Sequence, residues 1–179
     1  MLKIPFHLLP TGKNPPTEIF CLVEIPKGCS NKYELDLKTG AFRLDRVLYE
    51  SVFFPTEYGI IPRTWSLEDN DPLDVMVLSS FPTFTGCVIA CRPIGLMRIN
   101  DSGERDDKII AIPTDDPRFK NISDLNDVNP HLKKEIKNFW ENYAQLQPNK
   151  KIKFLGWSQK QAAWETIRKA MKIYESKSW

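Results

Sequence analysis

Residues 32–48, KYELDLKTGAFRLDRVL, contain the clearest signal for the fold. Apolar and polar residues alternate over 32–37 and again over 41–48, with KTG at 38–40 between the two runs. Such alternation is typical of a strand with one buried face, and two such runs around a glycine-containing turn indicate an antiparallel hairpin. The hairpin predicts a chain built largely from short strands.

Apolar segments on both sides of the hairpin continue the series. Pro93 falls inside the longest of them, where a missing N–H predicts a break or a bulge. The further strands are predicted at 19–25, 74–78, 87–99, 108–113 and 151–157.

Two helices are expected near the end of the chain. Asn129 is suited to cap a helix that begins with Pro130, and Ser158 with Gln161 matches a capping box for a second one. Many short strands followed by two helices predict an α+β, mainly β fold, a small closed or half-closed barrel with helices packed outside. The apolar faces are Leu132, Ile136, Phe139, Trp140, Tyr143 and Leu146 in the first helix, and Ala163, Trp164, Ile167, Met171 and Tyr174 in the second.

Composition narrows the class of protein. The chain has 179 residues and a formal net charge of +2, which is long enough for one domain, expected to span 1–179, and gives no general signal for nucleic-acid binding. It has no apolar run of 18 residues, so no membrane span is expected, and its first residues lack a signal-peptide pattern. Four cysteines without a CxxC pair predict reduced thiols and a cytoplasmic protein.

The most acidic turn is DNDPLDV at 69–75, with Asp69, Asp71 and Asp74. An EF-hand is excluded by spacing, because position 12 counted from Asp69 is Ser80. Only two histidines exist and neither lies near a cysteine pair, which argues against a dedicated zinc site. Carboxylate oxygens favour Mg²⁺ or Mn²⁺. A solvated acidic turn is the alternative for this motif alone.

A second acidic loop makes the metal-site hypothesis stronger. NDSGERDDK at 100–108 lies between two predicted strands and contains Asp101, Asp106, Asp107 and Lys108. Taken alone, this segment is an ordinary charged hairpin loop. If the two acidic loops face each other on one barrel, they could together hold several divalent ions.

Several separated motifs together resemble the soluble family I inorganic pyrophosphatases, from about residue 19 to residue 157. The resemblance implies a five-stranded, OB-like closed barrel with flanking helices. The motifs are VEIPKGCSNKYELD (23–36), DRVL (45–48), FFPTEYGIIPRT (53–64), DNDPLDV (69–75), CRPIG (91–95), DSGERDDK (101–108) and GW (156–157).

The resemblance also implies residue roles. Asp71 would accept a proton from the attacking water and orient it. The metal ligands would be Glu24, Asp69, Asp74, Asp101 and Asp106. The substrate would be bound by Lys32, Arg46, Tyr58, Lys108 and Tyr143.

By the same resemblance, the reaction is hydrolysis of inorganic pyrophosphate to two orthophosphates. Mg²⁺ is the expected cofactor, with Mn²⁺ or Zn²⁺ as substitutes and Ca²⁺ as an inhibitor. No nucleic-acid partner is expected, and the short chain resembles the relatives that form homohexamers.

The chain departs from the family pattern at two positions. Phe54 replaces a tyrosine, which removes one hydroxyl near the expected metal site. Ala144 replaces a phosphate-binding lysine, which predicts weaker substrate binding unless Lys150 or Lys151 replaces it.

Two other classes stay open on these residues. One is an OB-fold module that binds single-stranded nucleic acid, although the acidic loops argue against it. The other is a pyrophosphatase-like protein that has lost activity and serves as an assembly partner, which Phe54 and Ala144 keep open.

Overall fold

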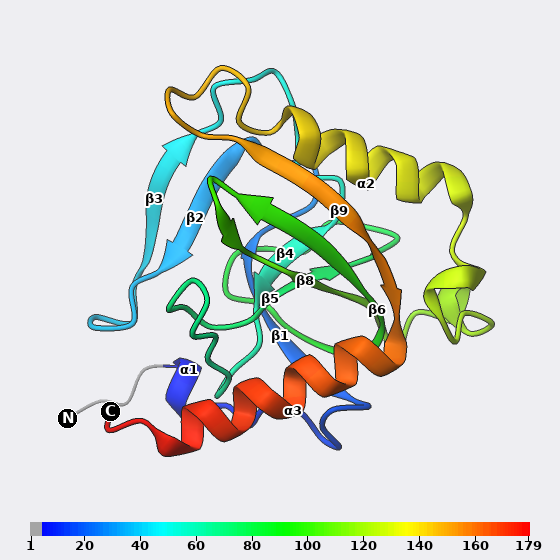
Figure 1. Ribbon diagram of the computed structural model, residues 1–179. Coiled ribbons are helices and arrows are strands. Elements are labelled where there is room, and N and C mark those ends of the chain that lie inside the picture. The colour runs from blue at the N-terminus through cyan, green and yellow to red at the C-terminus, as the bar shows by residue number, and fades with distance from the viewer. Residues whose placement is uncertain (1–4) are drawn as a thin grey trace.

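The computed structural model describes residues 5–179 (Figure 1). Three α-helices, two 3-10 turns and nine strands make up this part of the chain. The helices are α1 (Pro5–Leu8), α2 (Pro130–Asn142) and α3 (Lys160–Ser176), and the 3-10 turns are η1 (Pro117–Phe119) and η2 (Leu125–Asp127). The strands are β1 (Ile19–Ile25), β2 (Asn31–Leu35), β3 (Phe42–Val47), β4 (Glu57–Ile60), β5 (Asp74–Val77), β6 (Val88–Asp101), β7 (Glu104–Arg105), β8 (Lys108–Pro113) and β9 (Ile152–Gln159).

Five of the strands close into a ring. β1 pairs with β4, β4 with β5, β5 with β8, β8 with β6, and β6 again with β1. Only the β5–β8 contact of this ring is parallel. A closed ring leaves its strands without unpaired edges, which protects a mainly β protein from edge-to-edge association. The predicted OB-like, five-stranded closed fold is confirmed.

Strand β6 is the longest and organises the ring. Besides β1 and β8 it pairs with β9 and with the two-residue β7. The register of β6 against β8 shifts between Pro93 and Gly95, so the bulge predicted from Pro93 is confirmed. The bulge bends β6, so that this one strand can pair both within the ring and with β9.

The predicted hairpin forms a separate two-stranded sheet of β2 and β3. Gly40 has φ +74° in the turn, a left-handed conformation that glycine adopts without strain. Asp36 Oδ1 accepts hydrogen bonds from the N–H groups of Lys38 and Thr39 at 2.8 and 3.2 Å. The register pairs Lys32 with Arg46, so two cations predicted to bind substrate are neighbours.

Helix α2 begins as the sequence predicts. Asn129 accepts a hydrogen bond from the N–H of His131 at 2.8 Å, and Pro130 is the first helical residue. The helix ends at Asn142, so Leu146 lies beyond it and is exposed instead of extending the apolar face.

Helix α3 begins differently from the prediction. Gln159 is its N-terminal boundary residue and makes no side-chain cap, so the predicted capping box of Ser158 and Gln161 is wrong. Ser158 belongs instead to β9, where it pairs with Leu96 of β6. Strand β9 runs directly into α3, so Ser158 lies within the strand and cannot cap the helix.

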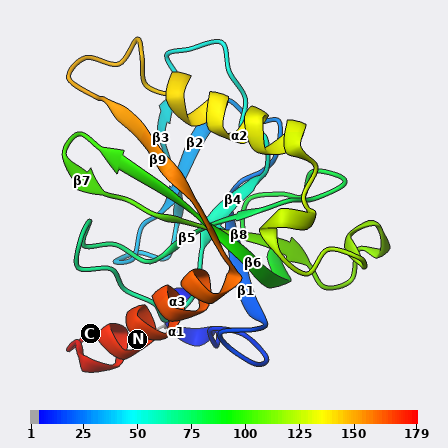
Figure 2. The same cartoon turned by 45° about the vertical axis from the view of Figure 1, so that its right-hand side comes forward.

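The two helices cover opposite sides of the ring, α2 above and α3 below in Figure 1, and the turned view of Figure 2 keeps them apart. Alternate residues of each strand pack toward α2 or toward α3, because successive side chains point to opposite faces of the sheet. Met76 and Ile110 pack with Trp140 of α2, whereas Val75 and Ile109 join the cluster that contains α3. Tyr58 belongs to the cluster of α2, and the candidate site lies beside that cluster.

Candidate active site

A cavity of about 480 Å³ lies between the ring, the 66–73 turn, the β6–β7 loop and α2. Six carboxylates and three ammonium groups line it, together with aromatic rings from β4 and α2. Its lining residues are Lys32, Tyr58, Asp69, Asp71, Asp74, Asp101, Ser102, Glu104, Asp106, Lys108, Trp140, Tyr143 and Lys150.

The parallel strands β5 and β8 build the centre of the cavity. Their register pairs Val75 with Ile109, so the preceding residues Asp74 and Lys108 lie side by side. The ammonium of Lys108 donates hydrogen bonds to Asp74 Oδ2 and Asp106 Oδ1, and the side chain is only 2% exposed. Burial alone lowers the pKa of Lys108, but the two carboxylates outweigh it and hold the pKa well above its usual value.

Tyr58 and Trp140 complete this centre. The Tyr58 hydroxyl donates to Asp74 Oδ2 at 2.6 Å. Lys108 Nζ lies 5.7 Å from the Tyr58 ring centroid and 5.4 Å from that of Trp140, within the range of cation–π attraction. Asp74 therefore accepts from two neighbouring donors at one oxygen.

The acidic turn directs its two other aspartates to the same cavity. Asn70 between them has φ +56°, a left-handed conformation that asparagine tolerates better than most residues. Burial raises the pKa of Asp69 to about 6. Burial also raises the pKa of Asp71 to about 7, and the carboxylates of Asp74 and Asp69 add to the rise.

Glu24 lies deeper, near the end of β1. It is buried and accepts a hydrogen bond from the N–H of Leu35 at 2.8 Å. Burial raises its pKa to about 8, against the lowering effect of that hydrogen bond. Glu24 lines a smaller adjoining pocket of about 150 Å³, whose wall also contains Asp71 and Asp74.

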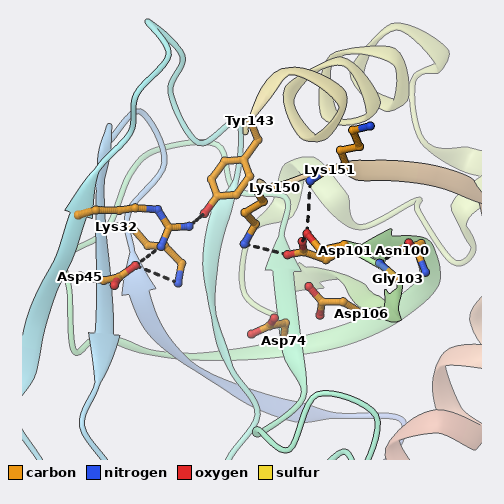
Figure 3. A network of polar contacts seen from close by, with 12 residues as sticks. Lys32, Asp45, Asp74, Asn100, Asp101, Gly103, Asp106, Tyr143, Lys150 and Lys151 are labelled. Atoms are coloured by element: carbon orange, nitrogen blue, oxygen red, sulfur yellow. Dashed lines mark hydrogen bonds and ion pairs between the residues drawn. The ribbon is translucent and has the colours of Figure 1, made fainter. Parts of the chain in front are cut away.

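The β2–β3 hairpin supplies cations from the opposite side (Figure 3). Lys32 lines the cavity, and its Nζ lies 3.5 Å from Asp45 Oδ2. Arg46 Nη2 donates to the Tyr143 hydroxyl at 2.9 Å. Among the predicted site residues, Arg46 and Glu24 are not on the wall of this cavity, although each adjoins residues that are.

The last side of the cavity joins Asp101 to Lys150. Lys150 Nζ lies 2.8 Å from Asp101 Oδ2 and 5.9 Å from the centroid of the Tyr143 ring. Lys151 is exposed, and its side chain is directed away from Asp101 (Figure 3). Of the two lysines considered as replacements for the one missing at 144, only Lys150 lines the cavity.

The two positions that depart from the family pattern lie in the same buried cluster. Phe54 is 1% exposed, and its ring centroid lies 4.9 Å from that of Phe139 and 5.4 Å from that of Tyr58. Ala144 is also buried in the cluster beneath α2. Both positions therefore contribute to packing behind the site, and neither forms part of the cavity wall.

The carboxylates of the cavity are the groups available to hold a divalent cation. Within residues 5–179, no three acidic, histidine or cysteine side chains lie close enough together to hold a metal ion as they stand. The donors are nevertheless carboxylate oxygens, the ligands that Mg²⁺ prefers. Asp69 Oδ1 is buried and has no hydrogen-bond partner in the described part of the chain. Because such an oxygen is costly unless a cation or proton satisfies it, the residues fit a divalent cation.

Sequence reasoning missed some members of the cavity wall. Trp140 was predicted only as an apolar face residue, and Ser102 and Glu104 were not singled out within the second acidic loop. Both Ser102 and Glu104 lie within the acidic motif at 100–108, which was the signal that could have identified them. No sequence signal distinguished Trp140 from the other aromatic residues of its helix.

Solved structures of known proteins share this fold. The crystal structure of an inorganic pyrophosphatase from Thermus thermophilus matches with a TM-score of 0.91 and 39% identity, over 98% of this chain and 99% of that one. An inorganic pyrophosphatase from Helicobacter pylori matches with a TM-score of 0.87 and 36% identity, over 89% and 95% of the two chains. The five-stranded ring and its flanking helices thus define a protein of the inorganic pyrophosphatase class.

Sequence comparison agrees over nearly the whole chain. The family model described as inorganic pyrophosphatase matches residues 21–175. An inorganic pyrophosphatase of Haloferax volcanii is 47% identical over 165 residues, which cover 92% of this chain and 93% of that protein. Soluble inorganic pyrophosphatase 3 of Arabidopsis thaliana is 46% identical over 170 residues, covering 95% and 78%. The chain belongs to the inorganic pyrophosphatase family, which confirms the resemblance found in the sequence.

Proposed function

We propose that this chain hydrolyses inorganic pyrophosphate to two orthophosphates with Mg²⁺ as its cofactor. The observation that carries the proposal is the cavity in which six carboxylates face three ammonium groups on the fold of a pyrophosphatase family. Without further cations, this excess of carboxylates would repel a diphosphate anion.

Asp69, Asp74, Asp101 and Asp106 would hold divalent cations, and Glu24 would hold one through waters. The unpartnered Asp69 Oδ1 supports the first of these roles. When bound, Mg²⁺ supplies positive charge that neutralises the diphosphate and polarises the attacking water.

Asp71 is proposed to orient the attacking water and to accept its proton. Its carboxylate lines both the main cavity and the adjoining pocket with Glu24. A pKa raised to about 7 by burial suits this role, because a general base works best when its pKa lies near the operating pH.

Substrate oxygens would be bound by cations and phenols from several elements. Lys32 and Arg46 approach from the β2–β3 hairpin, Lys108 from β8, Tyr58 from β4 and Tyr143 from the C-terminal end of α2. Since Tyr58 already donates to Asp74 and Tyr143 accepts from Arg46, the two hydroxyls would also keep these charged groups in position.

Release of phosphate from pyrophosphate tests the proposal. We expect hydrolysis with Mg²⁺, weaker activity with Mn²⁺ or Zn²⁺, and none after chelation. Ca²⁺ should inhibit, because its larger and looser coordination misplaces the reacting groups. Undiminished hydrolysis in excess chelator would refute the metal role, and oligonucleotide binding without phosphate release would favour a nucleic-acid-binding module.

We also propose a single domain over residues 1–179 in a cytoplasmic homohexamer. The free cysteines Cys21, Cys29, Cys87 and Cys91 support a reducing compartment. None of the helices within residues 5–179 is long and apolar enough to cross a membrane. The hexamer rests on the similarity to short-chain relatives, and sedimentation equilibrium of the purified protein would test it.

A further inference from the structure

The position of Lys150 is built by the backbone around it. The N–H of Ser102 donates to the carbonyl of Lys151 at 2.8 Å, and the N–H of Lys151 donates back to Ser102 Oγ at 3.3 Å. Asp101 itself pairs in register with Ile152 at the start of β9. These contacts join the β6–β7 loop to the residues before β9 and hold the Lys150 ammonium beside Asp101.

The ion pair lies at the cavity wall and is largely shielded from solvent. The side chains of Lys150 and Asp101 are 24% and 20% exposed. Asp101 Oδ2 contacts the ammonium, while Oδ1 accepts from Ser102 Oγ at 2.9 Å. Both oxygens of a proposed metal ligand therefore already have partners, one of which carries a full positive charge.

A divalent cation at Asp101 would compete with Lys150 for that carboxylate. Like charges repel strongly at such short range, so the ammonium would lose its partner. A three-quarters-buried ammonium without a counter-charge is unfavourable. A diphosphate in the same cavity would offer it an anionic oxygen, and Lys150 already lies near Tyr143, a proposed substrate-binding residue.

We propose that Lys150 is a substrate-binding residue that exchanges partners, pairing with Asp101 until a divalent cation takes this carboxylate and then binding the diphosphate. The proposal rests on the proposed function for the identity of the ligands. It assigns to Lys150 the phosphate contact that Ala144 cannot make, and it gives Asp101 two alternative cationic partners.

The experiment compares Lys150→Gln with the neighbouring Lys151→Gln in the full chain. Lys151 is the matched control, because it carries the same charge next in sequence but directs its side chain away from the cavity. Calorimetry measures binding of methylenediphosphonate, a diphosphate that resists hydrolysis, in the presence of Mg²⁺. Electron paramagnetic resonance measures Mn²⁺ binding without any diphosphate.

Lys150→Gln should change the two affinities in opposite directions. The Kd for methylenediphosphonate should rise by about tenfold, the lower end expected for loss of a charge-assisted hydrogen bond. The Kd for Mn²⁺ should fall about two- to fivefold, because an ion pair no longer competes for Asp101. Lys151→Gln should leave both values within about twofold of the unchanged protein.

Three results would overturn the proposal. They are unchanged diphosphonate binding in Lys150→Gln, equal weakening by Lys151→Gln, and a joint loss of both affinities, which would indicate that the ion pair only braces the loop. Failure of the proposed function would look different, since the unchanged protein would then release no phosphate from pyrophosphate whatever the two variants did.

Discussion

At the scale of single residues, Asp71 and Asp74 differ in what surrounds them. Asp74 Oδ2 accepts from both Tyr58 and Lys108 at the centre of the cavity. The pKa of Asp71 is raised to about 7, chiefly by burial. One carboxylate is thus held by fixed cationic and phenolic donors, whereas the other can take up a proton near neutral pH. This contrast predicts different defects when each is changed to asparagine.

Asp71→Asn should keep the Mn²⁺ affinity but lose turnover by roughly 10² to 10⁴, the usual contribution of a positioned general base. Asp74→Asn should instead raise the Mg²⁺ concentration needed for activity. It should also lower the melting temperature, because it removes one of the two carboxylates that neutralise the buried ammonium of Lys108.

Steady-state kinetics across a Mg²⁺ titration, with thermal melts of the same samples, would separate these effects. Near-normal turnover of Asp71→Asn at neutral pH would remove Asp71 from its proposed role. An unaltered metal requirement in Asp74→Asn would contradict its role as a ligand.

At the scale of elements, the turn before β5 depends on α3. The N–H of Trp65 donates to the carbonyl of Ala170 in α3 at 3.0 Å, and Trp65 Nε1 donates to Asn70 Oδ1 at 3.3 Å. The N–H of Ser66 donates to the carbonyl of Asp71 at 2.8 Å. The helix thereby holds the turn that presents two of the acidic residues.

Asn70→Ala should weaken Mn²⁺ binding and lower stability, since alanine in the left-handed region costs roughly 1–2 kcal/mol and cannot accept from Trp65. Asn70→Gly keeps the backbone freedom and loses only the side-chain contact, so its effects should be smaller. Mn²⁺ titration and thermal melts of the two variants check this order. Equal effects of alanine and glycine would show that the backbone conformation of Asn70 does not matter.

Several elements could be predicted from the sequence because their signals are local. β1 and β8 have the predicted bounds, since each is a short apolar run buried on the ring. β4 was missed because it has four residues, begins with Glu57 and contains Gly59. Glu57 tolerates its burial because its carboxylate accepts hydrogen bonds from Thr83 and Ser79. A Cβ at position 59 would lie 2.1 Å from the carbonyl oxygen of Leu22, so only glycine fits.

The candidate site was predictable to a similar degree. The aspartates of the two acidic loops occur in motifs whose spacing survives in the linear chain, and the ring brings them to one cavity. The pair of Asp101 and Lys150 could not be read in this way, because its residues are 49 positions apart and meet only through the β6–β9 register. The pairing of β9 with β6 likewise places Ser158 in a strand, which the local sequence could not reveal.

At the scale of the whole molecule, charge is distributed unevenly. The chain has a formal net charge of +2, yet its cavity carries twice as many carboxylates as ammonium groups. A divalent cation that binds there should stabilise the folded protein, because ligands that bind only the folded state shift the unfolding equilibrium.

Mg²⁺ should therefore raise the melting temperature in the absence of pyrophosphate, with a gain of about 2.7 kcal/mol in unfolding free energy at a hundredfold excess over Kd. Differential scanning calorimetry with matched NaCl ionic strength would measure it. Asp69→Asn should reduce the gain, since it alters the buried oxygen that lacks a partner. A melting temperature that follows ionic strength alone, whatever the cation, would argue against a specific site.

The two ends of the described chain are held together by aromatic rings. Phe6 of α1 lies 5.6 Å from Tyr174 and 6.0 Å from Trp179, measured between ring centroids, and Trp65 lies 5.0 Å from Trp179. Phe6 and Tyr174 are 168 positions apart, so their contact closes nearly the whole described chain into one loop. Contacts of such large sequence separation slow folding, because the entropy of closing the loop is lost before the contact can stabilise the structure.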